Sequence, residues 1–335
     1  MLQNKLYGLT ILLMLIFIFG LSPAMAQEGR KLKVLVVFSY EENHPFTADY
    51  KEGIEPVLGK LCEIRYFYMN TKTNFNGGAE KAGQVFALYR EFQPDGVIAA
   101  DDDAQAMFVV PYLKDKVKTP VMFCGVNAEP EKYGYPASNV SGVLEQLHIR
   151  ESVSLAQQII PSVKTIGFMM KESPVATFIS SQIGRESHSY SAVSAGVRYP
   201  KTLKEALAMA EEWKSRCDIL YLTSLQGLIG DDGKPLEEKQ MYKTVINAFG
   251  KPVMGSNEYQ VRLGALCSIV QSMQEHGETS AQMLLKAMNG MPVSRIPITQ
   301  NKEGKAFVNA TVLKAMGISI DPTVLASVNL VKTEE

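Results

Sequence analysis

The chain has 335 residues, of which 46% are hydrophobic and 21% charged, and its formal net charge is -1 at pH 7. This composition excludes a disordered or fibrous protein, and the near-neutral charge gives no reason to expect a nucleic-acid partner. The length is sufficient for two domains, each with its own buried core.

The first 26 residues have the pattern of a secretory signal peptide. Lys5 precedes an almost continuously apolar run at 9–21, and residues 24–26 (AMA) form a small-x-small cleavage site. An apolar core of about 13 residues is shorter than the roughly 20 needed to span a bilayer, which argues against an uncleaved membrane anchor. We therefore expect cleavage near Ala26 and a mature protein that is periplasmic or otherwise secreted.

Strand-like and helix-like segments alternate through the first part of the mature chain. Such alternation predicts an α/β fold with a doubly wound parallel sheet, and a strand order of 2-1-3-4 would place the switch point between the first and third strands. The expected strands are 33–39, 62–69, 95–100 and 121–124, and the expected helices between them are 46–60, 79–92 and 104–114.

The alternation restarts after an extended segment at 139–145 and an amphipathic helix at 149–160, which predicts a second wound lobe. Its expected strands are 165–170, 191–197, 218–223, 252–255 and 264–270, and its helices are 176–187, 203–214 and 237–249.

The C-terminal part of the chain predicts a hinge made of several strands. A long helix is expected at 273–288, followed by an extended stretch at 297–309 and a short helix at 310–316. We expect the long helix to return and pack on the first lobe, so that the chain crosses between the lobes more than once. The predicted division is 32–142 with 270–292 for the first lobe, and 143–269 with 293–335 for the second.

The four cysteines lie in or beside apolar strand-like runs and show no CxxC spacing typical of a metal or redox site. Buried thiols are the simplest interpretation. Export would permit a disulfide, and Cys217 with Cys267 is the first pair to consider, because both belong to the expected second lobe.

Polar residues follow several expected strands, at the edge of an open α/β sheet where ligands bind. Tyr40 or Phe46 can stack on an apolar or cationic ligand body, and a carboxylate can accept charge-assisted hydrogen bonds from a ligand ammonium. The candidate ligand-binding residues of the first lobe are Ser39, Tyr40, Glu42, Phe46, Asp101, Asp102, Asp103, Gly125 and Asn127, and those of the second lobe are Ser173, Thr223, Ser224 and Asn257.

Each candidate also has a structural interpretation. Asp103 stands just before an expected helix and is a preferred N-cap residue, and the second-lobe candidates suit ordinary turns and helix caps. Helix capping accounts for one of three adjacent aspartates. We therefore predict that Asp101 or Asp102 selects a positively charged ligand, such as the ammonium of an amino acid or amine.

The sequence offers an enzyme little support. The four histidines show no metal spacing, and there is no GxSxG, Walker or GxGxxG motif. A hard cation at the three aspartates is an alternative, although adjacent turn residues rarely all point at one ion. We expect no cofactor and no metal.

The segments VLVVFSYEENHPFTADYKEGI, YMNTKTN, PDGVIAADDDAQAMF, PVMFCGVN and NVSGV occur in an order that resembles ABC-transporter substrate-binding proteins of the tryptophan/tyrosine-permease type. The resemblance extends over nearly the whole mature chain. It implies two Rossmann-like lobes of the type I periplasmic binding protein kind, a small ligand held between them, delivery to a membrane permease, a monomer and no catalysis.

The resemblance leaves two questions open. Parts of the same segments are similar to the extracellular sensor domains of some histidine kinases, so a ligand-sensing module with a signalling partner is the alternative function. Family members that take aromatic amino acids have a hydroxyl-rich turn after the third strand, where this chain has three aspartates. The resemblance therefore implies no particular ligand.

Overall fold

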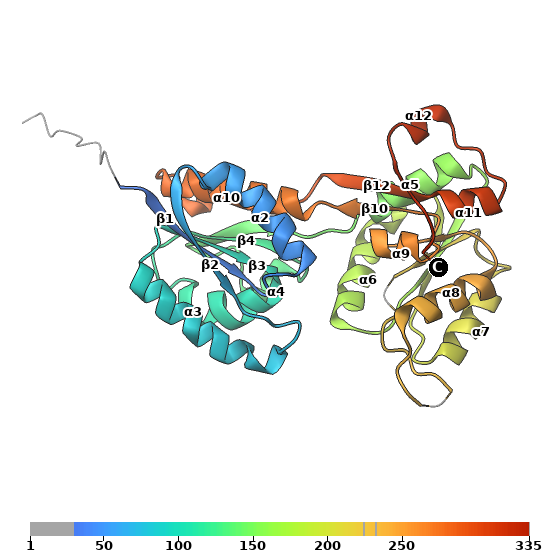
Figure 1. Ribbon diagram of the computed structural model, residues 1–335, viewed down its shortest axis with the longest axis horizontal. Coiled ribbons are helices and arrows are strands. Elements are labelled where there is room, and N and C mark those ends of the chain that lie inside the picture. The colour runs from blue at the N-terminus through green and yellow to red at the C-terminus, as the bar shows by residue number, and fades with distance from the viewer. Residues whose placement is uncertain (1–29, 224, 232, 335) are drawn as a thin grey trace, which may run out of the picture. The chain divides into compact units, whose positions relative to one another are not determined.

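A computed structural model describes residues 30–223, 225–231 and 233–334, which contain two β-sheets flanked by helices (Figure 1). The expected signal peptide and the candidate Ser224 lie outside the described residues. Within the described part of the chain, no helix combines the length and apolar character needed to cross a membrane.

The first sheet has six strands in the order β11-β5-β4-β3-β1-β2, which confirms the predicted 2-1-3-4 order of the first four. β1 pairs with β3, β3 with β4, β4 with β5 and β5 with β11, all in parallel. The bounds are β1 (Leu32–Phe38), β2 (Cys62–Tyr68), β3 (Gly96–Ala100), β4 (Val121–Val126), β5 (Val140–Leu144) and β11 (Thr299–Gln300).

Helices cover both faces of this sheet because its strands are apolar on both sides. α3 (Gly78–Phe92) and the π-helix η2 (Gln105–Leu113) pack on one face. α2 (Pro45–Leu58) and α10 (Met273–Met288) lie together on the other, as Figure 1 shows. The helix expected at 273–288 thus packs on the first sheet. The short elements are η1 (Phe75–Gly77), α4 (Asp101–Ala104), η3 (Pro130–Tyr133) and η5 (Val293–Arg295).

α2 and α10 approach each other at two glycines. A Cβ atom placed on Gly53 would lie 2.0 Å from the carbonyl oxygen of Gln274, and one on Gly277 would lie 2.2 Å from that of Tyr50. Both neighbours are backbone atoms, which cannot move aside as a side chain can. Glycine at these positions thus allows the two helix backbones to touch.

The second sheet has seven strands in the order β13-β12-β10-β9-β8-β6-β7. All the pairs are parallel except β10 with β12, which is antiparallel. The bounds are β6 (Thr165–Met169), β7 (Val193–Arg198), β8 (Ile219–Leu222), β9 (Val253–Met254), β10 (Cys267–Gln271), β12 (Gly304–Asn309) and β13 (Asn329–Val331). β13 was not predicted.

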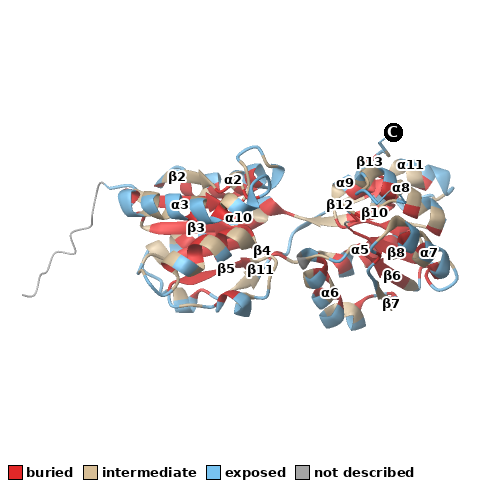
Figure 2. Ribbon diagram, turned by 90° about the horizontal axis from the view of Figure 1, so that it is seen from below, coloured by how far each residue is buried: buried red, intermediate tan, exposed pale blue. Residues whose placement is uncertain are grey.

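Helices again cover both faces of the sheet. In both lobes the strands between the helices contain many of the buried residues (Figure 2). α5 (Ile149–Ile159), α6 (Pro174–Glu186) and α11 (Ala310–Ala315) contribute to one apolar cluster, and α7 (Leu203–Trp213) and α8 (Glu238–Phe249) to another. The remaining helices are η4 (Ser187–Ser189), α9 (Glu258–Arg262) and α12 (Pro322–Leu325), of which the sequence predicted none.

The disulfide considered between Cys217 and Cys267 is not formed. Both thiols are buried and free, and they belong to the two different apolar clusters of the second sheet. Cys217 packs with Trp213 and Cys267 with Val308. The sheet therefore lies between the two sulfur atoms.

Three segments join the two sheets: the one after β5, the one between β10 and α10, and the one between β11 and β12. The sheets differ from the predicted lobe boundaries at the third segment, because β11 pairs with β5 in the first sheet. The Ser141 hydroxyl also donates to the carbonyl oxygen of Ile296 at 2.7 Å. The chain thus leaves the first sheet after Gln300, whereas the predicted division placed residues from 293 onward in the second lobe.

Candidate ligand-binding site

A cavity of about 250 Å³ lies where strands of both sheets end. Its size suits a small organic ligand. Six predicted residues line it, namely Tyr40, Phe46, Asp101, Asn127, Thr223 and Asn257. The other lining residues are Lys72, Glu145, Leu147, Val175, Phe178, Ile179, Glu238, Ser256, Tyr259, Gln260 and Gln271.

Asp101 is the buried carboxylate at the end of β3. Its side chain is only 4% exposed, and its backbone has φ +68°, in the left-handed region that residues other than glycine rarely adopt. The Tyr50 hydroxyl donates to its Oδ1 atom at 3.3 Å. Burial and the nearby Glu145 carboxylate raise the pKa of Asp101 well above its usual value, whereas Lys72 opposes that shift.

Gly125 makes room for this arrangement. It has φ +65°, and a Cβ atom there would lie 1.9 Å from the Tyr50 hydroxyl oxygen. Any larger residue would therefore displace Tyr50 from Asp101. Gly125 does not line the cavity, and a backbone contact from it to a ligand stays a prediction.

Asp102 has a structural role that the sequence did not reveal. Its carboxylate accepts hydrogen bonds from the backbone N–H groups of Asn127 at 3.0 Å and Ala128 at 3.2 Å, and from the Tyr133 hydroxyl at 2.7 Å. These bonds fix the turn after β4, which carries Asn127 to the cavity. Asp102 itself does not line the cavity.

We expect the Asp102→Asn substitution to lower the free energy of unfolding by about 1–3 kcal/mol, because an amide cannot accept all three hydrogen bonds with the strength of a carboxylate. Urea denaturation of the wild type and the variant measures this difference. Asp103→Asn is the control, since Asp103 is a neighbouring carboxylate that does not line the cavity. If Asp102→Asn had the stability of the wild type but a lower affinity for the ligand, Asp102 would bind the ligand as the sequence predicted and would not have this structural role.

Ser39 links β1 to the start of α4. Its buried hydroxyl donates to the carbonyl oxygen of Ala100 at 2.7 Å and accepts from the N–H group of Ala104 at 2.9 Å. The predicted N-cap role of Asp103 is wrong, because α4 begins at Asp101 and Asp103 lies within its first turn. Ser39 satisfies the helix N–H group from a neighbouring strand.

Two further candidates lie away from the cavity lining. Glu42 is exposed and accepts a hydrogen bond from the Tyr68 hydroxyl at 3.2 Å. Ser173 caps α6, because its hydroxyl accepts a hydrogen bond from the N–H group of Ala176 at 3.0 Å. This is the helix-cap interpretation given from the sequence. Contact between these residues and a ligand stays a prediction.

Glu145 is a lining residue that was not predicted from the sequence. It follows β5 directly and is 7% exposed, with Oε2 accepting from Asn127 Nδ2 at 3.0 Å and Oε1 from Gln271 Nε2 at 2.8 Å. Burial raises the pKa of Glu145 to about 7, although the hydrogen bonds from Asn127 and Gln271 favour its charged form. The strand-end rule that selected Asp101 would also have found Glu145.

One cation and several aromatic rings complete the first-lobe side of the cavity. The Lys72 ammonium lies 4.2 Å from the centroid of the Tyr40 ring, which is cation–π distance. The imidazole of His44 lies between Tyr40 and Phe46, with ring centroids 4.8 Å and 5.2 Å away. Lys72 follows β2, whose end the sequence analysis did not consider as part of the site.

The second lobe contributes an apolar wall and a polar floor. Val175, Phe178 and Ile179 come from α6, on turns facing the cavity. The polar group is interconnected: the Thr223 hydroxyl lies 2.9 Å from that of Ser256, and the Ser256 N–H group donates to the Gln260 side chain at 2.7 Å. Asn257 caps α9 and also lines the cavity.

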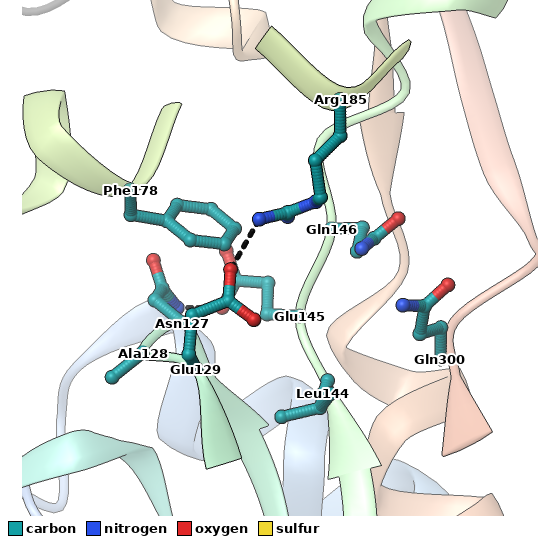
Figure 3. Close-up of a pocket in the computed structure, with 9 residues that line it drawn as sticks. All are labelled: Asn127, Ala128, Glu129, Leu144, Glu145, Gln146, Phe178, Arg185 and Gln300. Carbon is teal, nitrogen blue, oxygen red and sulfur yellow. Dashed lines mark hydrogen bonds and ion pairs between the residues drawn. The ribbon is translucent and has the colours of Figure 1, made fainter. Parts of the chain in front are cut away.

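A smaller cavity of about 60 Å³ adjoins this site and shares Asn127, Glu145 and Phe178 with it. Figure 3 shows the Arg185 guanidinium of α6 directed at the Glu129 carboxylate, with which it forms an ion pair. The phenyl ring of Phe178 lies beside this pair in the same view. This ion pair forms one polar rim of the smaller cavity.

The described residues include no group of three or more His, Cys, Asp or Glu side chains arranged to hold a metal ion. Asp101 and Asp102 contact different partners, Tyr50 and the turn after β4. The three aspartates thus do not converge on one point.

Two wound, mainly parallel sheets that are joined by three segments and line one cavity define a two-lobed ligand-binding protein of the type I periplasmic binding protein kind. The chain belongs to the ABC transporter substrate binding protein family, whose model matches residues 68–332. This is a family of substrate-binding proteins and not of enzymes. The resemblance described from the sequence is confirmed.

Individual relatives are more distant. The chain is 24% identical over 210 residues to a tyrosine-binding protein of Clostridioides difficile (strain R20291), a match that spans 62% of this chain and only 57% of that relative. A ligand-free, open structure of a substrate binding protein with adhesive properties from Clostridium difficile has a TM-score of 0.70 at 19% identity and covers 90% of this chain and 100% of its own. The ABC domain from Streptococcus pneumonia in complex with L-Trp has a TM-score of 0.61 at 19% identity, covering 90% of this chain and 99% of its own.

Proposed function

We propose that this protein is exported, captures a small ligand that carries an ammonium group on an apolar body, and delivers it to the membrane permease of an ABC transporter. The ligand class is an amino acid with an apolar side chain or a related amine. The observation that carries the proposal is the buried Asp101 carboxylate at the end of β3, held by Tyr50 and facing the cavity.

The charges of the cavity favour a cation. Asp101 and Glu145 are both buried, and Lys72 is the basic residue among the lining side chains. Burial of a carboxylate is costly, and Lys72 offsets only part of that cost for Asp101, whose pKa stays raised; a ligand ammonium that reaches Asp101 offsets more of it. Charge-assisted hydrogen bonds to that ammonium add to the affinity.

The other walls suit an apolar body. Phe46, Val175 and Tyr259 line the cavity and are 37%, 52% and 46% exposed, so a ligand that covers them removes apolar surface from water. The names of two similar proteins mention tyrosine and L-Trp, which both combine an ammonium with an apolar ring. One aspartate of the acidic turn, Asp101, lines the cavity.

Delivery to a permease and export rest on family membership and on the leader pattern of the first 26 residues. In this proposal the protein acts as a monomer and does not change its ligand chemically.

The first experiment is native mass spectrometry of gently purified protein, followed by calorimetric titration with L-tyrosine, L-tryptophan, L-leucine and 2-phenylethylamine. We expect at least one of these ammonium compounds to bind and to be recovered unchanged. N-acetyl-L-tyrosine and 3-phenylpropionate, which lack the ammonium, are the matched controls. Binding of an anionic control in preference to every ammonium compound would contradict the proposal, and chemical conversion of a bound compound would indicate an enzyme.

A further inference from the structure

We propose that Glu145 is a second cation-binding carboxylate of this cavity, and that the protein releases a proton when it takes up its ligand. The inference rests on the proposed function, because it assigns a further residue to the same cationic ligand. It concerns a residue that follows β5 on the first of the three segments joining the sheets.

The position of the Glu145 carboxylate is fixed by its neighbours. Asn127 Nδ2 donates to one oxygen at 3.0 Å and Gln271 Nε2 to the other at 2.8 Å. Asn127 follows β4 and Gln271 ends β10, so the two donors approach from different sheets. The backbone is fixed as well, because the N–H group of Gln146 donates to the Asn301 side chain at 2.7 Å and the Asn301 amide donates back to the carbonyl oxygen of Gln146 at 3.1 Å.

An acceptor without a donor lies beside this carboxylate. The Oε1 atom of Gln271 is buried and has no hydrogen-bond partner, although the same amide donates to Glu145 and Gln271 lines the cavity. Leaving a buried carbonyl oxygen unpaired is costly. An ammonium has three N–H donors, and the three residues Asp101, Glu145 and Gln271, the last with its unpaired Oε1 acceptor, line the same cavity.

Charged and titratable groups face Glu145 from several elements. Asp101 and Asp102 of α4 carry the same sign, whereas Lys72 carries the opposite one. Tyr40, Tyr50 and Cys124 also interact with the Glu145 charge. The Arg185 guanidinium lines the adjoining cavity and is paired with Glu129. Burial and the neighbouring carboxylates thus disfavour ionisation of Glu145 in the empty protein, whereas Lys72 favours it.

The direction of proton movement follows. With a pKa of about 7, Glu145 is largely protonated at pH 6 in the empty protein and largely ionised at pH 8. A bound ammonium favours the carboxylate, so at pH 6 the O–H bond of Glu145 breaks, its electron pair stays on the carboxylate and the proton passes to water. Affinity for the cation therefore rises with pH. For one group of this pKa the gain between pH 6 and pH 8 is about tenfold.

The titration of Glu145 also makes the stability of the ligand-free protein depend on pH. The pKa of Glu145 in the folded state, about 7, lies above the ordinary value of 4.5. The stabilisation from protonated Glu145 is consequently complete below that ordinary value and is lost as the pH rises through about 7. Asp101 is shifted in the same direction, so a comparison of variants is needed to identify Glu145.

The test is calorimetric titration with L-tyrosine and with 2-phenylethylamine at pH 6 and pH 8, in buffers of different ionisation enthalpy that count released protons. Wild type, Glu145→Gln and the exposed control Glu80→Gln are compared. We expect the ratio of affinities at pH 8 and pH 6 to be about tenfold smaller in Glu145→Gln than in the wild type and Glu80→Gln, with proton release at pH 6 reduced by about one.

A ligand-free measurement keeps the inference testable if Glu145→Gln is destabilised. Thermal unfolding of the wild type from pH 5 to pH 8 should show a loss of stability that is smaller in Glu145→Gln. If wild type binds either ammonium compound and Glu145→Gln keeps the same pH dependence of affinity and the same proton release, Glu145 has no such role. If wild type binds no ammonium compound, the proposed function itself fails, and this inference fails with it.

Discussion

The Asp101→Asn variant should bind an ammonium-bearing ligand about ten- to a hundredfold more weakly than the wild type. The substitution nearly preserves the shape of the side chain but removes its charge, and losing a charged hydrogen bond costs about 1.5–3 kcal/mol. Asp101 is the appropriate position because it combines burial with a place in the cavity lining. Calorimetric titration at pH 8 with 2-phenylethylamine, which has no carboxylate of its own, measures the difference.

Asp103→Asn is the matched control for this experiment. It removes the same charge two residues further along α4, from a side chain that does not line the cavity. Its affinity should stay within about twofold of the wild type, because partly exposed charges beyond a binding site are well screened. Equal affinities in the wild type and both variants would show that the acidic turn does not recognise the ligand charge.

The largest effect on stability is expected from Gly53→Ala. The added Cβ atom would lie 2.0 Å from the Gln274 carbonyl oxygen and 2.6 Å from the Glu278 backbone nitrogen, so α2 and α10 must separate. Overpacking of this kind costs about 1–3 kcal/mol and more when only backbone can yield, and we expect at least about 3 kcal/mol. Urea denaturation provides the measurement.

Gly83→Ala controls for the change in helix propensity. Gly83 lies within α3, and a Cβ atom there would meet nothing within 4 Å. Alanine is favoured over glycine in a helix by about 1 kcal/mol, so this variant should be slightly more stable than the wild type. If Gly53→Ala were also as stable as the wild type, the close approach of α2 and α10 would be wrong.

Much of the fold could be predicted because its strands are buried on both faces. Runs such as Val34–Phe38 and Val97–Ala100 are apolar without interruption, and turn residues bound them, so both their type and their parallel arrangement could be inferred. β11 falls within the extended stretch expected at 297–309, but its place in the first sheet could not be inferred, since Thr299 and Gln300 are polar and join that sheet only by pairing with β5. The short helices α9 and α12 were missed for the related reason that each spans little more than one turn.

Some of the candidate residues line the cavity and others do not, and the difference has a physical reason. The carboxyl ends of parallel strands lie at one edge of a sheet, which located Asp101, Asn127 and Thr223 correctly in the cavity lining. The rule does not say which way a side chain turns, and Asp102 turns back to satisfy backbone N–H groups of its own lobe. Residues that a helix presents, such as Phe178, cannot be found by a rule about strand ends.

The first lobe is built from pieces that are far apart in the chain, and this affects the order of folding. Its sheet needs β11 beside β5, and the hydrogen bond between Ser141 and Ile296 joins residues 155 positions apart. The face on which α2 lies is fully covered only when α10 packs beside α2. Contacts between residues so distant in sequence close slowly, because the intervening chain must first lose its freedom. A chain emerging from the ribosome would therefore carry an incomplete first lobe until about nine-tenths of it had been made, only shortly before β12 and β13 complete the second sheet.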